Sequence, residues 1–124
     1  MGGDETAREL WRYAQRRGAL VVCLVRHGQT EWNASRRFLG RTDIGLDEVG
    51  RTQALSFARA LPDRFTHVYS SPLLRARETA AALGQPFLEA PELVELHQGH
   101  LEGLEAASAL TRFPDFFARW HQDP

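Results

Sequence analysis

A run of apolar residues, ALVVCLV at positions 19–25, constrains the fold of this 124-residue chain more than any other feature. Valine and leucine follow one another there without alternating with polar residues, which is typical of a strand buried on both faces of a parallel sheet. The run leads directly into Arg26, His27 and Gly28. In open parallel sheets, ligands bind beyond the carboxyl ends of the strands. The sequence therefore predicts that these three residues belong to a binding site.

Helical and strand-like patterns alternate along the rest of the chain. They predict helices over 5–17, 48–61 and 71–83, short strands over 66–70 and within 86–96, and a mostly helical tail over 104–120 with a break at Pro114. This alternation favours an α/β fold, in which helices flank a parallel sheet. We expect residues 1–18 to form an N-terminal helical extension and residues 19–124 to form one domain.

The ends of the three predicted helices carry residues that are typical of helix boundaries. Asp4, Asp47 and Ser71 are expected to cap the three N-termini, with Pro72 at the first position of the third helix, and Gly18, Pro62 and Gly84 are expected to end the helices.

The composition excludes several classes of function. A net charge of -1 disfavours nucleic-acid binding, and no segment is long and apolar enough to cross a membrane or to act as a secretory signal, so we expect a cytoplasmic protein. All 15 cationic residues are arginines, which excludes a lysine nucleophile or Schiff base. Cys23 is the only cysteine, so it has no partner for an intrachain disulfide, and we expect a buried structural thiol.

The residues around the histidine are suited to an oxyanion. The guanidinium of Arg26 is a planar, permanently charged donor, and Thr30 and Asn33 add short polar groups within a few residues. Arg75 falls in the first turn of a predicted helix that comes after the second strand, so a second guanidinium is expected to face the same crevice. A neutral His27 there could attack phosphorus and form a phosphohistidine, which water would later cleave.

A leaving alkoxide also needs a proton, and a carboxylic acid can supply it. The segment ELHQGHLEG and the residues after it offer Glu95, Glu102 and Glu105. The chemistry alone does not choose among the three.

Two histidines in the same segment suggest another possibility. His97 and His100, together with Glu95 and Glu102, could ligate a metal ion. However, Gly99 argues against one shared helical face, and the spacing matches no strong metal-binding signature. We expect neither a metal nor any other cofactor.

Four motifs in order between residues 21 and 103 together resemble one family: VRHGQTEWN, FLGRTDIGLDEVGRTQA, YSSPLLRARETA and ELHQGHLEG. The sequence is similar to the N-terminal portion of the histidine phosphatase superfamily, the phosphoglycerate-mutase-like proteins. It is most similar to the short bacterial phosphatase branch, which includes α-ribazole-phosphatase-like members.

The resemblance implies a role for each site residue. It makes His27 the phosphorylated nucleophile, Arg26, Asn33 and Arg75 the phosphate ligands, Thr30 and Gly40 neighbours of the bound substrate, and Glu95 the proton donor and acceptor. Glu102 and Glu105 are then expected to be structural. The implied substrate is a phosphorylated small molecule, and the implied fold is a phosphoglycerate-mutase-like parallel sheet flanked by helices.

The resemblance favours a phosphatase over a mutase. Mutases of the cofactor-dependent type carry a longer insertion around the acid segment to enclose phosphoglycerate, whereas in this chain that segment comes soon after the second arginine motif and the stretch after it is short. A mutase must keep water away from the phosphohistidine, whereas a phosphatase must admit it. Mutase-type phosphoryl transfer, a phosphate-binding domain that has lost turnover, and a metal-dependent hydrolase are the alternatives.

The family also has a second histidine, in a motif like Ser-His-Gly after a later strand, and this chain ends before such a segment. We therefore expect a fold that is truncated at its C-terminus and leaves an apolar edge beside residues 19–25. Either a C-terminal partner segment or another copy of the chain is expected to complete the sheet, or the chain is a fragment of a longer product. No motif supports His97, His100 or His121 as a replacement for the second histidine.

Overall fold

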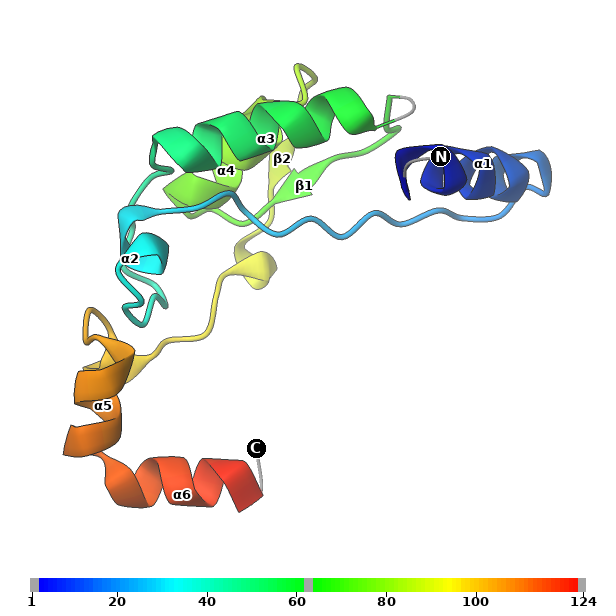
Figure 1. The fold of residues 1–124 in the computed structure, drawn as a ribbon. Helices are drawn as coiled ribbons and strands as arrows, with labels where there is room; N and C mark the ends of the chain where they lie inside the picture. Colours follow the sequence, from blue (N-terminus) through cyan, green and yellow to red (C-terminus); the bar gives the residue numbers. More distant parts are fainter. Residues whose placement is uncertain (1–2, 62–63, 123–124) are drawn as a thin grey trace.

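The computed structural model describes residues 3–61 and 64–122 (Figure 1). The elements follow in the order α1 (Gly3–Arg16), α2 (Glu31–Ala34), α3 (Glu48–Ala60), β1 (Tyr69–Ser70), α4 (Leu74–Ala81), β2 (Leu88–Glu89), η1 (Pro91–Leu93), η2 (Gly99–Leu101), α5 (Ala106–Arg112) and α6 (Pro114–Gln122). This mixture of helices with a small parallel sheet confirms the predicted α/β class.

The two strands form a parallel pair, with Tyr69 opposite Leu88 and Ser70 opposite Glu89. The amide of Leu88 donates to the carbonyl of Val68 at 2.9 Å, and the pair is therefore hydrogen-bonded from its first residues. Parallel strands need a crossover connection, and α4 supplies it. Both short strands were predicted from the sequence.

Residues 19–25 are extended but pair with no strand in the described chain, and Figure 1 shows them as a long ribbon without an arrow after α1. The side chains of Leu20 and Leu24 are 90% and 93% exposed. The prediction of a strand buried on both faces is therefore wrong for the described residues. A central strand needs a hydrogen-bonded strand along each edge, and no described strand pairs with residues 19–25. Cys23, which was expected to be buried, is partly exposed for the same reason.

The predicted helix boundaries are partly confirmed. The side chain of Asp47 caps α3 by accepting the amide of Gly50 at 2.7 Å. The backbone φ angles of Gly18 and Gly84 are 65° and 67°, in the left-handed region expected beyond a helix end. The predicted cap at Asp4 and the predicted helix end at Pro62 remain predictions, because the side chain of Asp4 and the whole of Pro62 lie outside the described residues.

The start of α4 differs from the prediction. The helix begins at Leu74, and neither Ser71 nor Pro72 is part of it. The carboxylate of Asp43 accepts the amide of Leu74 at 2.7 Å, so a residue far away in the sequence satisfies the helix N-terminus. This contact also joins the loop before α3 to α4.

The apolar core is small and the centre of the molecule is polar. In the part of the chain that the structure describes, Leu46, Ala54, Leu73 and Ala109 are the buried apolar side chains, whereas the largest fully buried side chains are Arg75 and Thr30. The loop that carries His27 packs against the start of α3 so closely that a Cβ atom on Gly50 would collide with the backbone of Gln29. Buried polar groups need hydrogen-bond partners, so their bonds determine how this region is built.

The C-terminal helices pack below the loop after α2. Arg37 pairs with Glu105 and Phe38 with Glu102 in two isolated bridges, and the ring of Phe38 lies 6.0 Å from that of Phe117 in α6. The predicted helical tail with a break near Pro114 is confirmed as α5 and α6.

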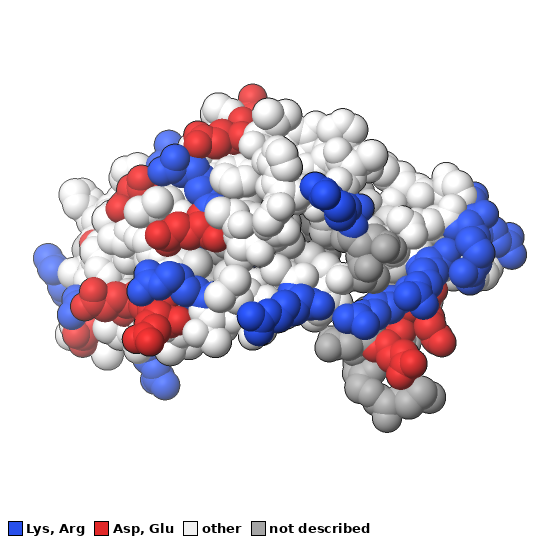
Figure 2. Space-filling view, turned by 90° about the horizontal axis from the view of Figure 1, so that it is seen from above, with Lys and Arg blue, Asp and Glu red and all other residues white. Residues whose placement is uncertain are grey.

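The N-terminal helix contacts the far end of α3. The guanidinium of Arg8 donates to the carbonyl of Ala60, the last residue of α3, at 3.3 Å, and Trp11 contacts the ring of Phe65 edge-on. Figure 2 shows cationic side chains gathered over the end of the molecule where α1 lies, with mixed charges over the rest of that face. No helix in the described part of the chain is long and apolar enough to span a bilayer.

Replacing Asp47 by alanine tests the capping of α3. We expect Asp47→Ala to lower the urea midpoint of unfolding at pH 7, and Glu48→Ala, which removes a neighbouring charge but no cap, to have less effect. The hydrogen bond from Gly50 lowers the pKa of Asp47. A lowered pKa in the folded state contributes stability above the unfolded pKa, near 3.8, and that stability is lost as the pH falls through the folded value. The difference between the wild type and Asp47→Ala should therefore shrink below about pH 4, and a difference that grows in acid would contradict this account.

Candidate active site

His27 is half-buried and has a defined tautomer. Its Nδ1 lies 2.7 Å from the carbonyl of Gly28, and because a carbonyl only accepts, Nδ1 carries the proton and Nε2 keeps its lone pair. Burial lowers the pKa of His27; the hydrogen bond to Gly28 opposes this shift, and the charges of Arg75 and Arg26 lower the pKa further. The imidazole is therefore neutral at neutral pH and can act as a nucleophile through Nε2.

Arg75 is the central charged group of the site. Only 2% of its surface is exposed. Its guanidinium donates to the carbonyl of Gly40 at 2.7 Å and to that of Thr42 at 3.1 Å. Neither acceptor carries a charge, and within residues 3–61 and 64–122 no carboxylate forms an ion pair with Arg75. A guanidinium has five N–H groups, so three remain for an anionic ligand.

Thr79 joins the histidine loop to the helix that carries Arg75. Its hydroxyl accepts the amide of Gly28 at 3.1 Å and donates to the carbonyl of Arg75 at 2.7 Å. Sequence reasoning missed this residue. The signal for it was the position of Thr79 one turn after Arg75, because residues four apart lie on one face of a helix.

Thr30 and Asn33 form a capping box at the start of α2. The Oδ1 atom of Asn33 accepts the amide of Thr30 at 3.0 Å and its hydroxyl at 2.9 Å, which leaves the Asn33 amide nitrogen as the donor toward a ligand. Thr30 is fully buried and its hydroxyl also accepts the amide of Asn33. In this structure Thr30 orients Asn33.

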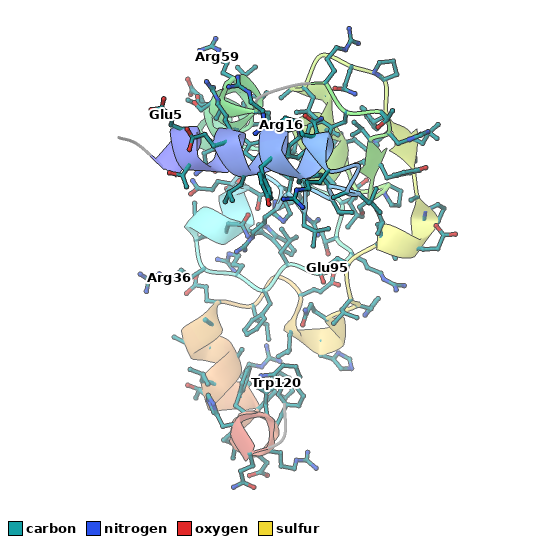
Figure 3. All side chains as sticks on the ribbon, turned by 90° about the vertical axis from the view of Figure 1, so that its right-hand side faces the viewer. Glu5, Arg16, Arg36, Arg59, Glu95 and Trp120 are labelled. Atoms are coloured by element: carbon teal, nitrogen blue, oxygen red, sulfur yellow. The ribbon has the colours of Figure 1, made fainter. Side chains whose placement is uncertain are left out.

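The structure separates the three candidate acids. Glu105 pairs with Arg37 on the surface at 2.9 Å, and Glu102 accepts hydrogen bonds from several backbone amides. Glu95 is exposed and lines the same hollow as His27. Figure 3 shows Glu95 between the layer of α1, α3 and α4 and the C-terminal helices. Its charge acts on both His27 and Arg75 and opposes the lowering of their pKa values.

One hollow of about 1360 Å³ brings five of the predicted site residues together. Arg26, His27, Asn33, Arg75 and Glu95 all line it. Gly40 and Thr30 do not; Gly40 is buried behind Arg75 as one of its carbonyl partners. The hollow continues between residues 19–25 and residues 64–71. The site can thus accept an anion beside a neutral nucleophile and an accessible carboxyl group.

The histidines of the acid segment are arranged differently from a metal site. His97 uses Nδ1 to accept the amide of Gly99 at 2.8 Å. The described residues contain no group of three or more histidine, cysteine or acidic side chains placed to hold a metal ion.

A family model, that of the histidine phosphatase superfamily (branch 1), matches residues 22–124. The chain belongs to this superfamily.

Its relatives in the superfamily are named as phosphatases and mutases. The chain is 38% identical over 104 residues to a metal-independent phosphoserine phosphatase of Arabidopsis thaliana, covering 78% of this chain and 44% of the relative. It is 44% identical over 88 residues to a probable phosphoglycerate mutase, GpmB, of Photorhabdus laumondii, covering 67% and 41%. The chain spans about half the length of these relatives or less.

The solved structures show the same fold. The mycobacterial glucosyl-3-phosphoglycerate phosphatase Rv2419c, in complex with VO3, superposes with a TM-score of 0.72 at 35% identity, over 78% of this chain and 51% of that one. The present chain therefore has a phosphoglycerate-mutase-like fold, as the four motifs predicted.

The charge of Arg75 provides a test of the geometry around His27. We expect Arg75→Gln to raise the pKa of His27, because a cation next to the imidazole disfavours its protonation. The pKa can be measured by NMR titration of the His27 ring. Arg77→Gln, two residues further along α4 and paired with Glu89 at the surface, is the matched control and should leave the pKa unchanged. An unchanged His27 pKa in Arg75→Gln would show that the two groups do not face each other.

Proposed function

We propose that this site hydrolyses phosphomonoesters of small molecules through a phosphohistidine on His27. One observation carries the proposal: a buried guanidinium without an ion-paired carboxylate among the described residues lines the same hollow as a neutral imidazole whose Nε2 is free. A buried charge of this kind favours a bound anion, and a phosphoryl group supplies one.

In the first step Nε2 of His27 attacks phosphorus and the bond from phosphorus to the ester oxygen breaks. Arg26, Asn33 and Arg75 hold the phosphoryl oxygens, and Thr30 and Gly40 lie behind these ligands. Glu95, as a carboxylic acid, gives its proton to the leaving alkoxide.

In the second step water attacks the phosphohistidine. The Glu95 carboxylate takes a proton from the water, the bond from Nε2 to phosphorus breaks, and inorganic phosphate leaves. No step needs a metal or another cofactor. We include a cytoplasmic location in this proposal, together with the division into an N-terminal helical extension (1–18) and a catalytic portion (19–124).

Mutase-type transfer is the second candidate, since one relative is named as a probable phosphoglycerate mutase. Exposure of Glu95 at the hollow favours hydrolysis, because water reaches the position from which it would attack.

We also propose that a β-strand from outside the described residues completes the sheet beside this site. The carbonyls of Val68 and Ser70 bond to the β2 side. Backbone groups alternate along a strand, so those of Tyr69 face the opposite edge, toward the hollow that residues 19–25 also line. The occupant that fits is an apolar strand from the half of the fold that the solved relative contains and this chain does not cover.

Hydrolysis of p-nitrophenyl phosphate, with a chelator present, tests the nucleophile. We expect turnover by the folded chain and its loss in His27→Ala. His67→Ala is the matched control, because His67 lines the same hollow and has no role in the proposed chemistry. A folded wild-type chain without turnover would contradict hydrolysis by this chain and leave the phosphate-binding alternative.

The leaving group tests the acid. We expect Glu95→Gln to lower kcat/KM for an alkyl phosphate by about 100-fold or more, because general acid catalysis contributes about that much. The loss should be much smaller for p-nitrophenyl phosphate, whose leaving group needs no proton. Equal losses with both substrates would argue against Glu95 as the proton donor.

Adding the missing half in trans tests the strand. We expect a one-to-one complex between this chain and a C-terminal half taken from a solved relative, with backbone amides of residues 20–26 newly protected from hydrogen exchange. Val22→Asp should abolish the complex. Protection of these amides in the isolated chain, as a monomer or a homodimer, would overturn the proposal.

A further inference from the structure

Glu102 receives four hydrogen bonds from two separate segments. Its Oε1 accepts the amides of Arg41 at 2.8 Å and of Gln98 at 3.2 Å. Its Oε2 accepts the amide of Thr42 at 3.0 Å and also the Thr42 hydroxyl. One carboxylate thus joins residues 40–42, in the loop after α2, to the segment that begins at Glu95.

The loop that Glu102 holds is the loop that holds Arg75. The carbonyls of Gly40 and Thr42 are the two acceptors of the guanidinium. They flank Arg41, whose amide is bonded to Glu102 and whose Nε donates to the carbonyl of Glu95 at 2.9 Å. A movement of the Glu102 carboxylate would therefore displace both Arg75, the proposed ligand of phosphate, and the backbone of Glu95, the proposed acid.

The hydrogen bonds of Glu102 to Arg41, Thr42 and Gln98 form a clamp, and this clamp requires a glycine at position 40. A Cβ atom on Gly40 would collide with Oε1 of Glu102 and come within 2.8 Å of the amide nitrogen of Gln98. Real Cβ atoms essentially never approach other atoms this closely, so a side chain here would push the carboxylate away. The lack of a side chain at Gly40 therefore allows the Glu102 carboxylate to occupy its position.

We propose that Glu102 is a positioning residue: it fixes residues 40–42 so that the carbonyls of Gly40 and Thr42 aim the guanidinium of Arg75 at a phosphoryl group. The inference rests on the proposed function, because it assigns that aim to phosphate. The sequence predicted only a structural role for Glu102, and the inference adds a defined effect of this residue on phosphate binding.

The Glu102 carboxylate is charged throughout the pH range in which the site would operate. The hydroxyl of Thr42 and the backbone amides of Arg41, Gln98 and Thr42 lower the pKa of Glu102 to about 2. The carboxylate therefore stays an acceptor for all four donors wherever the site would operate.

Charge and positioning predict opposite results, which makes the inference testable. The negative charge of Glu102 opposes anion binding at Arg75, so its removal alone would tighten phosphate binding. Loss of the clamp would weaken phosphate binding, because the guanidinium would no longer be held in place.

The experiment measures the affinity of the 124-residue chain for inorganic phosphate, and hydrogen exchange at the Nη–H groups of Arg75 that bond to Gly40 and Thr42, both by NMR. We expect Glu102→Gln to weaken phosphate binding about tenfold, the equivalent of 1.4 kcal/mol, and to speed the exchange. Thr42→Val removes the hydroxyl bond without changing charge and should act in the same direction. Glu105→Gln, which removes a like charge from the same segment, should change neither quantity.

Each outcome decides the matter. Phosphate binding that is unchanged or tighter in Glu102→Gln, or Arg75 exchange that is unchanged, would overturn the positioning role. If Glu102→Gln does not fold, Thr42→Val alone decides by the same two readouts. A wild-type chain that binds phosphate without turnover would contradict the proposed function and leave this test intact. Faster Arg75 exchange in a chain that never binds phosphate would retain the clamp but overturn its assignment to phosphate.

Discussion

The burial of Arg75 is the constraint on which the rest of the site depends. A guanidinium cannot give up its charge, and inside a protein it must be paired or fully hydrogen-bonded. Here two backbone carbonyls, those of Gly40 and Thr42, take the place of a carboxylate. The arrangement leaves the positive charge available, so a bound anion would complete it.

Several contacts exist to maintain this arrangement. The hydroxyl of Thr79, one turn along α4 from Arg75, donates to the carbonyl of Arg75 and accepts the amide of Gly28, so it connects Arg75 to the loop that carries His27. Asp43 accepts the first amide of α4, which joins that helix to the loop that carries Gly40 and Thr42. His27, Arg75 and Glu95 come from distant parts of the sequence, and hydrogen bonds between polar groups connect the segments that carry them.

Local features of the structure could be predicted from the sequence, and features that depend on distant residues could not. The cap at Asp47 depends on Gly50, three residues away, and the two short strands pair with each other across the single helix α4. The start of α4 was misplaced because its cap, Asp43, is 31 residues away from its partner. Residues 19–25 have the composition of a central strand, but a strand forms only against neighbours that the described chain does not supply. The chemistry could not choose among three glutamates; the structure separates them by what each one contacts.

The central claim is that His27 carries the phosphoryl group, and trapping that intermediate tests it most directly. The chain would be mixed with an aryl phosphate, quenched in alkali, digested and mapped by mass spectrometry, with a second sample quenched in acid. We expect a phosphoryl group on His27 that survives alkali and is lost in acid, and none in His27→Ala. A phosphoryl group on another residue, or turnover in His27→Ala, would contradict it.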